Sequence, residues 1–209
     1  MQPLLVTFAI PEEKIDFPET DFPLRTVFTG IGKTQAAMVT TEAIPHYRPF
    51  AVLNVGTAGT LRHQVNDVIV SRHFVDRDLV PLAIEGLCAE VRLPSALFPE
   101  LTPILQEFTG LSPEKTGPIP DLVVSTGDNF VTQGEVGEAD AVDMEAFAEA
   151  IVCRHFGLPF VSVKCITDVV GENSVATWAE RLRSANEVLR AYFQQKWGVS
   201  SKSNCRTNE

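Results

Sequence analysis

The chain has 209 residues, of which 44% are hydrophobic and 21% charged, a composition typical of a globular protein with one sizeable core. Its net charge of -10, from 17 basic and 27 acidic residues, repels the phosphates of nucleic acid and excludes a nucleic-acid-binding function. The N-terminal segment lacks the basic start and long apolar run of a signal peptide or membrane span. We therefore expect a cytoplasmic protein that does not enter a membrane.

Strand-like and helix-like segments alternate along the chain. Short β-rich runs predict strands at 3–10, 24–30, 50–56, 66–76, 121–128 and 158–170. Helical spacing predicts helices at 33–47, 95–110 and 143–156. This alternation favours an α/β layered sandwich with parallel or mixed strands covered by helices.

The C-terminal part carries the clearest helical pattern. Its apolar stripe consists of Trp178, Leu182, Ala185, Leu189, Tyr192 and Phe193. Thr177 and Glu180 have the T-x-x-E spacing of a capping box, which predicts the start of this helix. We expect residues 1–197 to form a single domain and the polar, aperiodic segment 198–209 to be a disordered tail.

Polar or glycine-rich groups follow four of the predicted strands. They occur in FAIPEE, LNVGTAGT, VVSTGDNF and VKCITDVV, and a fifth group is the VDMEA segment at 142–146. Each has a structural alternative: GTAG as a flexible turn, Glu12 and Glu13 as a solvated first turn, and Asp143 or Asp168 as a helix cap. Because ligands of α/β sheets bind beyond the strand ends, the groups taken together indicate a site.

The combination of motifs resembles the nucleoside phosphorylase/nucleosidase family, and within it the 5'-methylthioadenosine/S-adenosylhomocysteine nucleosidases. The resemblance covers most of residues 3–195 and includes, in family order, the paired glutamates, TGIGK (29–33), NVGTAGTL (54–61), NDVIVS (66–71), STGDNFV (125–131), VDMEA and ITDVV (166–170). It implies a three-layer α/β/α sandwich with a central mixed sheet. It also implies hydrolysis of the N-glycosidic bond of a purine nucleoside, no metal or organic cofactor, and a homodimer.

The same resemblance implies two catalytic residues. Breaking an N-glycosidic bond creates an oxocarbenium-like ribosyl cation while negative charge moves into the base. Asp168 matches the acid that protonates N7 of the purine, and burial after an apolar strand favours the neutral carboxyl that this role needs. Glu13 matches the base that activates water, although the departure from the family's usual sequence leaves Glu12 as an alternative.

Six further positions match substrate-binding residues of the family. They are Thr57 near the water and ribose, Phe130 stacked on the purine, Val131 at the base edge, Met144 beside the ribose, Glu145 on the ribose hydroxyls, and Lys164. Lys164 replaces the usual arginine and keeps its charge without its two-pronged geometry. Outside this set, Asp143 is expected to cap the following helix and Glu149 to be solvated or paired.

The segment after the first strand bears on whether water or phosphate would be the nucleophile. Phosphorylases of the family bind phosphate through arginines, whereas the first strand here is followed by the acidic PEEKIDFPE, and Arg62 is displaced from the phosphate-contacting position. We therefore expect hydrolysis of a methylthioadenosine- or S-adenosylhomocysteine-type nucleoside. The alternatives are a futalosine-type or other purine nucleoside hydrolase, a phosphate-dependent phosphorylase, and a non-catalytic nucleoside-binding protein.

Overall fold

The structure, a computed structural model, describes residues 1–93, 122–132, 137–171 and 174–197, with the backbone alone at 174–177. The predicted helix at 95–110 and the predicted tail at 198–209 lie outside the described residues. In the described part nine strands form one sheet: β1 (Leu4–Phe8), β2 (Leu24–Phe28), β3 (Ala51–Thr60), β4 (Val68–Ser71), β5 (His73–Asp76), β6 (Glu90–Arg92), β7 (Val123–Thr126), β8 (Ala141–Asp143) and β9 (Phe160–Val169).

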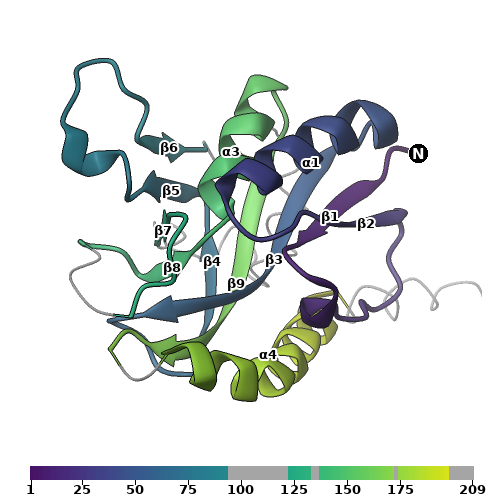
Figure 1. Ribbon diagram of the computed structural model, residues 1–209. Helices are drawn as coiled ribbons and strands as arrows, with labels where there is room; N and C mark the ends of the chain where they lie inside the picture. The colour runs from purple at the N-terminus through teal and green to yellow at the C-terminus, as the bar shows by residue number, and fades with distance from the viewer. Residues whose placement is uncertain (94–121, 133–136, 172–173, 198–209) are drawn as a thin grey trace, which may run out of the picture.

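Helices cover both faces of this sheet (Figure 1). Helices α1 (Lys33–Tyr47) and α3 (Ala146–His155) pack on one face, and α4 (Ser174–Trp197) packs on the other. Neighbouring residues of β1 belong to opposite cores: Leu5 packs with the α1 and α3 side, whereas Leu4 and Val6 pack with the α4 side. This alternation follows from the two-residue period of a strand. The three-layer α/β/α sandwich is therefore confirmed.

The sheet is mixed, as expected, and β3 and β9 form its long central pair. They run parallel from Val52 opposite Phe160 to Thr60 opposite Val169, with an irregularity between Ala58 and Gly59. β1, β5, β7 and β8 contribute further parallel pairs, while β3 with β8, β4 with β9, and β5 with β6 are antiparallel. The sheet thus contains two parallel sets, β1, β2, β3 and β9 in one and β5, β7 and β8 in the other, which meet at the antiparallel pair of β3 with β8. Loops that follow the carboxyl ends of parallel strands can form a site.

One prediction about the strands was wrong, and one strand extends further than predicted. The run 66–76 is two strands rather than one: β4 pairs with β9, and after Arg72 the chain continues as β5, which pairs with β6 and β7. Periodicity shows that a segment is extended, but it cannot show that the segment changes its partners. GTAG, for which a turn was the alternative, continues β3 as buried strand up to Thr60.

Two helix boundaries also differ from the predictions, whereas the helix at 33–47 has the predicted bounds. The segment after residue 140 first forms β8, and α3 begins at Ala146 rather than at residue 143. α4 begins at Ser174, so Thr177 and Glu180 are helical residues and not a capping box, which needs non-helical backbone at its first residue. No helix in the described ranges is long and apolar enough to cross a membrane.

Candidate active site

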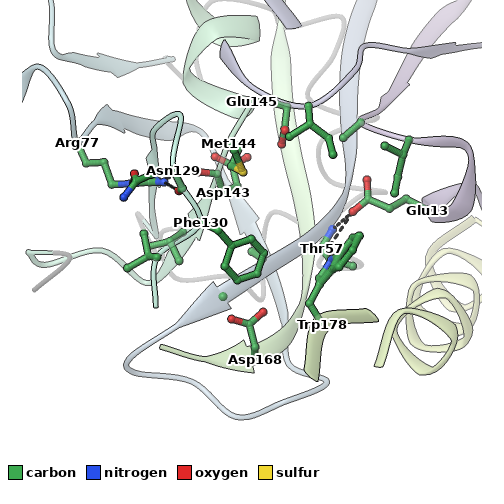
Figure 2. Close-up of a pocket in the computed structure, with 17 residues that line it drawn as sticks. Glu13, Thr57, Arg77, Asn129, Phe130, Asp143, Met144, Glu145, Asp168 and Trp178 are labelled. Carbon is green, nitrogen blue, oxygen red and sulfur yellow. Dashed lines mark hydrogen bonds between the residues drawn. The ribbon is translucent and has the colours of Figure 1, made fainter. Parts of the chain in front are cut away.

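A cavity of about 300 Å³ opens at the carboxyl edge of the parallel strands (Figure 2). Its walls come from the ends of β1, β3, β8 and β9, from the segments after β2, β5 and β7, and from the first part of α4. Seven of the eight site residues predicted from the sequence are among its lining: Glu13, Thr57, Phe130, Val131, Met144, Glu145 and Asp168. The fold therefore brings together side chains that lie up to 155 positions apart (13 to 168) in the sequence.

Glu13 reaches the cavity from a short 3-10 helix, η1 (Pro11–Glu13), which follows β1 and begins with proline. Its Oε1 accepts hydrogen bonds from the Thr57 amide at 2.9 Å and from the Thr57 hydroxyl at 2.7 Å. Glu13 is 5% exposed, whereas Glu12 is exposed to solvent, so only the second glutamate of the pair lines the cavity. A Cβ on Gly56 would lie 3.1 Å from both carboxylate oxygens, which explains the glycine within this strand.

Trp178 extends this arrangement from α4. Its indole Nε1 donates a hydrogen bond of 2.8 Å to the Thr57 hydroxyl, which in turn donates to Glu13 (Figure 2). The sequence predicted Trp178 as part of the apolar core stripe, but it lines the cavity instead. Further along α4, Ala185, Leu189 and Phe193 are buried as that stripe predicts. An apolar stripe shows which face of a helix is covered. It cannot show whether a residue on that face packs in the core or lines a cavity at the end of the helix.

Asp168 lies near the end of β9 and is 2% exposed. The Thr167 hydroxyl donates to its Oδ1 at 2.9 Å. Its register partner on β3 is Gly59, where a Cβ would lie 2.8 Å from Oδ2 of Asp168. The second glycine of GTAG thus gives room to the second carboxylate, just as Gly56 gives room to Glu13.

Phe130 and Val131 follow β7 and border the same part of the cavity as Asp168. In Figure 2 the Phe130 ring and Asp168 lie near each other, while Glu13 and Thr57 lie across the cavity. Phe130 is 37% exposed and lines the cavity, so its ring can contact a ligand there. Val131 is partly buried and packs against a small apolar cluster that includes Val142.

Asp143 ends β8 and joins three elements. Its Oδ1 accepts a hydrogen bond from the Thr126 hydroxyl at 2.6 Å, and its Oδ2 accepts one from the Ala146 amide at 3.0 Å. The second contact satisfies the first amide of α3, so Asp143 provides the capping interaction predicted for it, although the helix begins later than predicted. Lys164 Nζ lies 3.0 Å from the same Oδ2.

Lys164 departs from the prediction that it binds substrate. It is 2% exposed, lies on β9 opposite Gly56, and is not among the residues that line the cavity. Burial by itself lowers the pKa of Lys164, but the carboxylates of Asp143, Glu145 and Glu13 outweigh it and raise the pKa overall. Lys164 is therefore a charged residue behind the wall of the cavity, where it is paired with Asp143.

Glu145 lines the cavity and is 5% exposed. Its Oε1 accepts a hydrogen bond from the Gly32 amide at 3.0 Å. Burial raises its pKa to about 7, with Asp143 and Glu13 adding to the rise and Lys164 and the Gly32 amide opposing it. Gly32 has a φ of +94°, which glycine adopts readily, so TGIGK forms a turn that directs a backbone amide at this carboxylate.

A second contact fixes the same turn. Lys33 Nζ lies 2.8 Å from Asp76, which ends β5, and 2.7 Å from Asp78, two residues further along the chain. The Lys33 amide donates to Asp128 at 2.7 Å. The role of Lys33 was not predicted from the sequence. Arg62 is exposed and lies outside the lining, which agrees with its expected displacement from a phosphate-contacting position.

Glu149, one helical turn after Glu145, is fully buried and not solvated. The Thr7 hydroxyl donates to its Oε2 at 2.5 Å, and the Asn54 amide donates to its Oε1 at 2.9 Å. Burial raises its pKa to about 8, against the opposing effects of the Thr7 hydrogen bond and Lys164. Glu149 is thus paired within the core, on the side of α3 that faces the sheet, and does not line the cavity.

The cavity therefore presents acid–base groups at two ends and an aromatic ring between them. Four carboxyl side chains border it, those of Glu13, Asp143, Glu145 and Asp168. Within the described ranges, no group of three or more His, Cys, Asp or Glu residues is arranged to hold a metal ion.

Comparison with known proteins supports one family. The family model of the phosphorylase superfamily matches residues 23–194. The chain is 35% identical over 176 residues to a 5'-methylthioadenosine/S-adenosylhomocysteine nucleosidase of Geobacillus kaustophilus, a match covering 75% of this chain and 72% of the relative. It is 33% identical over 184 residues to the nucleosidase of the same name from a Marinomonas species, covering 80% of this chain and 77% of the relative.

Solved structures show the same fold. A 5'-methylthioadenosine/S-adenosylhomocysteine nucleosidase of Helicobacter pylori aligns with a TM-score of 0.73 at 22% identity, covering 96% of this chain and 99% of the other. A futalosine hydrolase of the same organism aligns with a TM-score of 0.75 at 22% identity, covering 96% and 98%. Because the family model spans most of the described strands and helices and relatives exceed 30% identity, the chain belongs to the phosphorylase superfamily.

Proposed function

We propose that the chain hydrolyses the N-glycosidic bond of a purine nucleoside of the methylthioadenosine/S-adenosylhomocysteine type, releasing the free base and a ribose derivative. The names of the relatives at 35% and 33% identity support this substrate class. The observation that carries the proposal is the cavity itself, which four carboxyl groups border while Arg77 is the one cation in its described lining. Such a site favours a developing cation over an incoming anion.

The part of the cavity lined by Asp168, Phe130 and Val131 would bind the purine and assist its departure. As the bond breaks, negative charge moves into the purine, and a proton delivered to N7 neutralises it. Asp168 is the acid in this proposal, because its buried carboxyl lines the same cavity as the partly exposed ring of Phe130, on which the purine would stack. The backbone of Val131 would meet the edge of the base.

The other end provides the ribose site and the nucleophile. Glu145 accepts hydrogen bonds from ribose hydroxyls beside Met144, and its negative charge stabilises the cation more in the transition state than in the ground state. Both hydrogen bonds from Thr57 to Glu13 use Oε1, so Oε2 is the oxygen that takes a proton from water. The hydrogen bond from Trp178 orients the Thr57 hydroxyl toward Glu13.

Water, rather than phosphate, is the nucleophile in this proposal. A phosphate ion needs cationic or amide donors that are available to it. Arg77 uses its five N–H groups on protein oxygens, and Lys164 is paired with Asp143 behind the wall. An anion in the cavity would instead face carboxylates, which repel it in a partly dry site.

A chromatographic assay for released base tests the proposal. The panel contains methylthioadenosine, S-adenosylhomocysteine, adenosine, inosine and futalosine, each incubated with and without inorganic phosphate. We expect adenine from the first two substrates at equal rates in both buffers, and strong loss of release in Glu13→Gln and Asp168→Asn. Release that requires phosphate would overturn the hydrolase proposal, and release from futalosine alone would replace the proposed substrate.

Three further expectations accompany this proposal: residues 1–197 act as one domain, the protein works in the cytoplasm, and it forms a homodimer. Exposed apolar side chains support the last of these, since Ile31, which lines the cavity, is 52% exposed and Met38 on α1 is 54% exposed. Such side chains favour burial against another surface. Light scattering during size-exclusion chromatography measures the mass in solution and decides between monomer and dimer.

A further inference from the structure

Arg77 follows β5 and reaches across the loop that follows β7. Its Nε donates to the Asn129 side-chain oxygen at 3.3 Å, and its Nη1 donates to the carbonyl oxygens of Ser125 and Asp143, each at 2.8 Å. Its Nη2 donates to the carbonyl oxygens of Gly127 at 3.1 Å and Asn129 at 2.5 Å. A guanidinium has five N–H donors, so this side chain uses its full capacity on the loop after β7 and on the ends of β7 and β8.

These contacts join the two segments that carry the proposed substrate-binding residues. Asn129 immediately precedes Phe130 and Val131, and Asp143 immediately precedes Met144 and Glu145. Three of the five hydrogen bonds end on the carbonyl oxygens of Gly127 and Asn129 or on the Asn129 side chain, within three residues of Phe130. The position of the ring therefore depends on where the guanidinium is held.

Gly127 shows that the fit is close. A Cβ on this residue would lie 2.7 Å from Nε of Arg77 and 2.8 Å from its Cζ. Any side chain at position 127 would push the guanidinium away from the loop. The charge is also matched to its surroundings: burial lowers the pKa of Arg77, while the carboxylates of Asp143, Asp78 and Asp76 oppose that effect and favour the cation.

We propose that Arg77 is a positioning residue that holds the loop at 127–131 against the Asp143–Glu145 segment and so forms the purine-binding part of the cavity. The inference rests on the proposed function. Because its five donors are engaged with the protein, Arg77 acts through the loop and not by contact with the substrate. A lysine offers a single ammonium in place of the planar fork and cannot make the same contacts.

Calorimetric binding of free adenine and steady-state kinetics test this role together. In Arg77→Ala and Arg77→Lys we expect the dissociation constant of adenine and the KM to rise about tenfold or more, while kcat falls less than KM rises. Added methylguanidine should restore part of the adenine affinity of Arg77→Ala, whereas methylammonium should not. A residue with a merely structural role would change the melting temperature without this selective rescue.

Gly127→Ala tests the same contact from the loop side with Arg77 still present. The added methyl group should displace the guanidinium and weaken adenine binding to a similar extent, and the double variant Arg77→Ala/Gly127→Ala should be no worse than the worse single variant. The Gly127→Ala variant keeps the proposal testable if Arg77→Ala fails to fold. Circular dichroism monitors the folding of each variant.

The results of these experiments test the positioning role of Arg77 separately from the proposed hydrolase activity. Adenine affinity within about twofold of wild type in both Arg77→Lys and Gly127→Ala would overturn the positioning role, whatever the enzyme's activity. Wild-type protein that binds adenine but releases no base from any nucleoside would overturn the hydrolase proposal and leave the adenine-binding test of Arg77 intact.

Discussion

Glu145 and Glu149 lie four residues apart at the start of α3, and they have nearly the same burial but different neighbours. Glu145 borders the cavity, accepts the Gly32 amide, and lies in the field of Lys164. Glu149 faces the sheet and accepts hydrogen bonds from the side chains of Thr7 and Asn54.

Burial raises the pKa of both glutamates, to about 7 for Glu145 and about 8 for Glu149. A raised pKa is therefore not enough to identify a functional carboxylate in this molecule. Lys164 lowers the pKa of both groups, so the difference lies in what else surrounds each one: a cavity for Glu145, and neutral hydrogen-bond donors in the core for Glu149. The former can act on a ligand, and the latter serves the packing of α3 on the sheet.

The largest expected effect comes from Glu145→Gln. The amide keeps the shape and can still accept the Gly32 amide, but it removes the negative charge beside the developing cation. We expect kcat/KM to fall about 100- to 1000-fold, as for the loss of other preorganised electrostatic contacts. Glu149→Gln is the matched control, since it makes the same chemical change one turn away. Equal losses in the two variants would remove the functional distinction between the glutamates.

A smaller change is expected from Lys164→Met. Lys164 lowers the pKa of Glu145, so its removal should raise that pKa further and leave less carboxylate near neutral pH. We expect kcat/KM of the wild type to increase as pH rises through about 7, and the same increase to occur at higher pH in the variant. The loss at neutral pH should be about tenfold for each unit of displacement.

Lys164→Arg is the charge-matched control for this experiment. It should leave the pH at which kcat/KM rises close to that of the wild type. An unchanged pH profile in Lys164→Met would contradict the assigned effect of Lys164 on Glu145.

The smallest effect on activity, and the clearest effect on stability, is expected from Glu149→Gln. The folded-state pKa of Glu149, about 8, lies above its ordinary value of 4.5, so the folded protein binds the proton more tightly than the unfolded chain. Its contribution to stability is thus fully present below about pH 4.5 and is lost as pH rises to about 8, at most roughly 5 kcal/mol in all.

Glutamine mimics the neutral carboxyl at every pH. The melting temperature of Glu149→Gln should therefore exceed that of the wild type at pH 9, and the two should converge near pH 5. Thermal unfolding followed by circular dichroism across this range measures the effect. A variant less stable than the wild type at pH 9 would show that Glu149 is held in the core as a carboxylate.

Much of the fold could be predicted because local patterns determine it. The helix at 33–47 and the central buried strands follow from periodicity, and the three-layer arrangement follows from their alternation. The division of 66–76 into β4 and β5 could not be predicted, since it depends on which distant strands each half meets. The late start of α3 has a similar cause, because residues 141–143 add to the sheet instead.

Residues of the candidate site could be predicted where they belong to a recognisable sequence motif. Seven predicted residues line the cavity, yet Arg77 and Trp178 were missed because their roles depend on contacts with residues 48 to 121 positions away. Lys164 was placed in the site because the family carries an arginine there, whereas the geometry pairs it with Asp143. The glycines of GTAG do not form a turn. A Cβ on Gly56 would lie 3.1 Å from the carboxylate oxygens of Glu13, and a Cβ on Gly59 would lie 2.8 Å from a carboxylate oxygen of Asp168, so both glycines leave room for a carboxylate.

The central claim is that water attacks the ribose in a cavity bordered by carboxylates. The direct test is turnover of methylthioadenosine in water labelled with oxygen-18, with phosphate present, followed by mass spectrometry of the sugar product. We predict a free sugar that carries one labelled oxygen from the attack at C1', with correction for exchange by a product-only control. An unlabelled ribose 1-phosphate derivative would contradict the account and identify phosphate as the nucleophile.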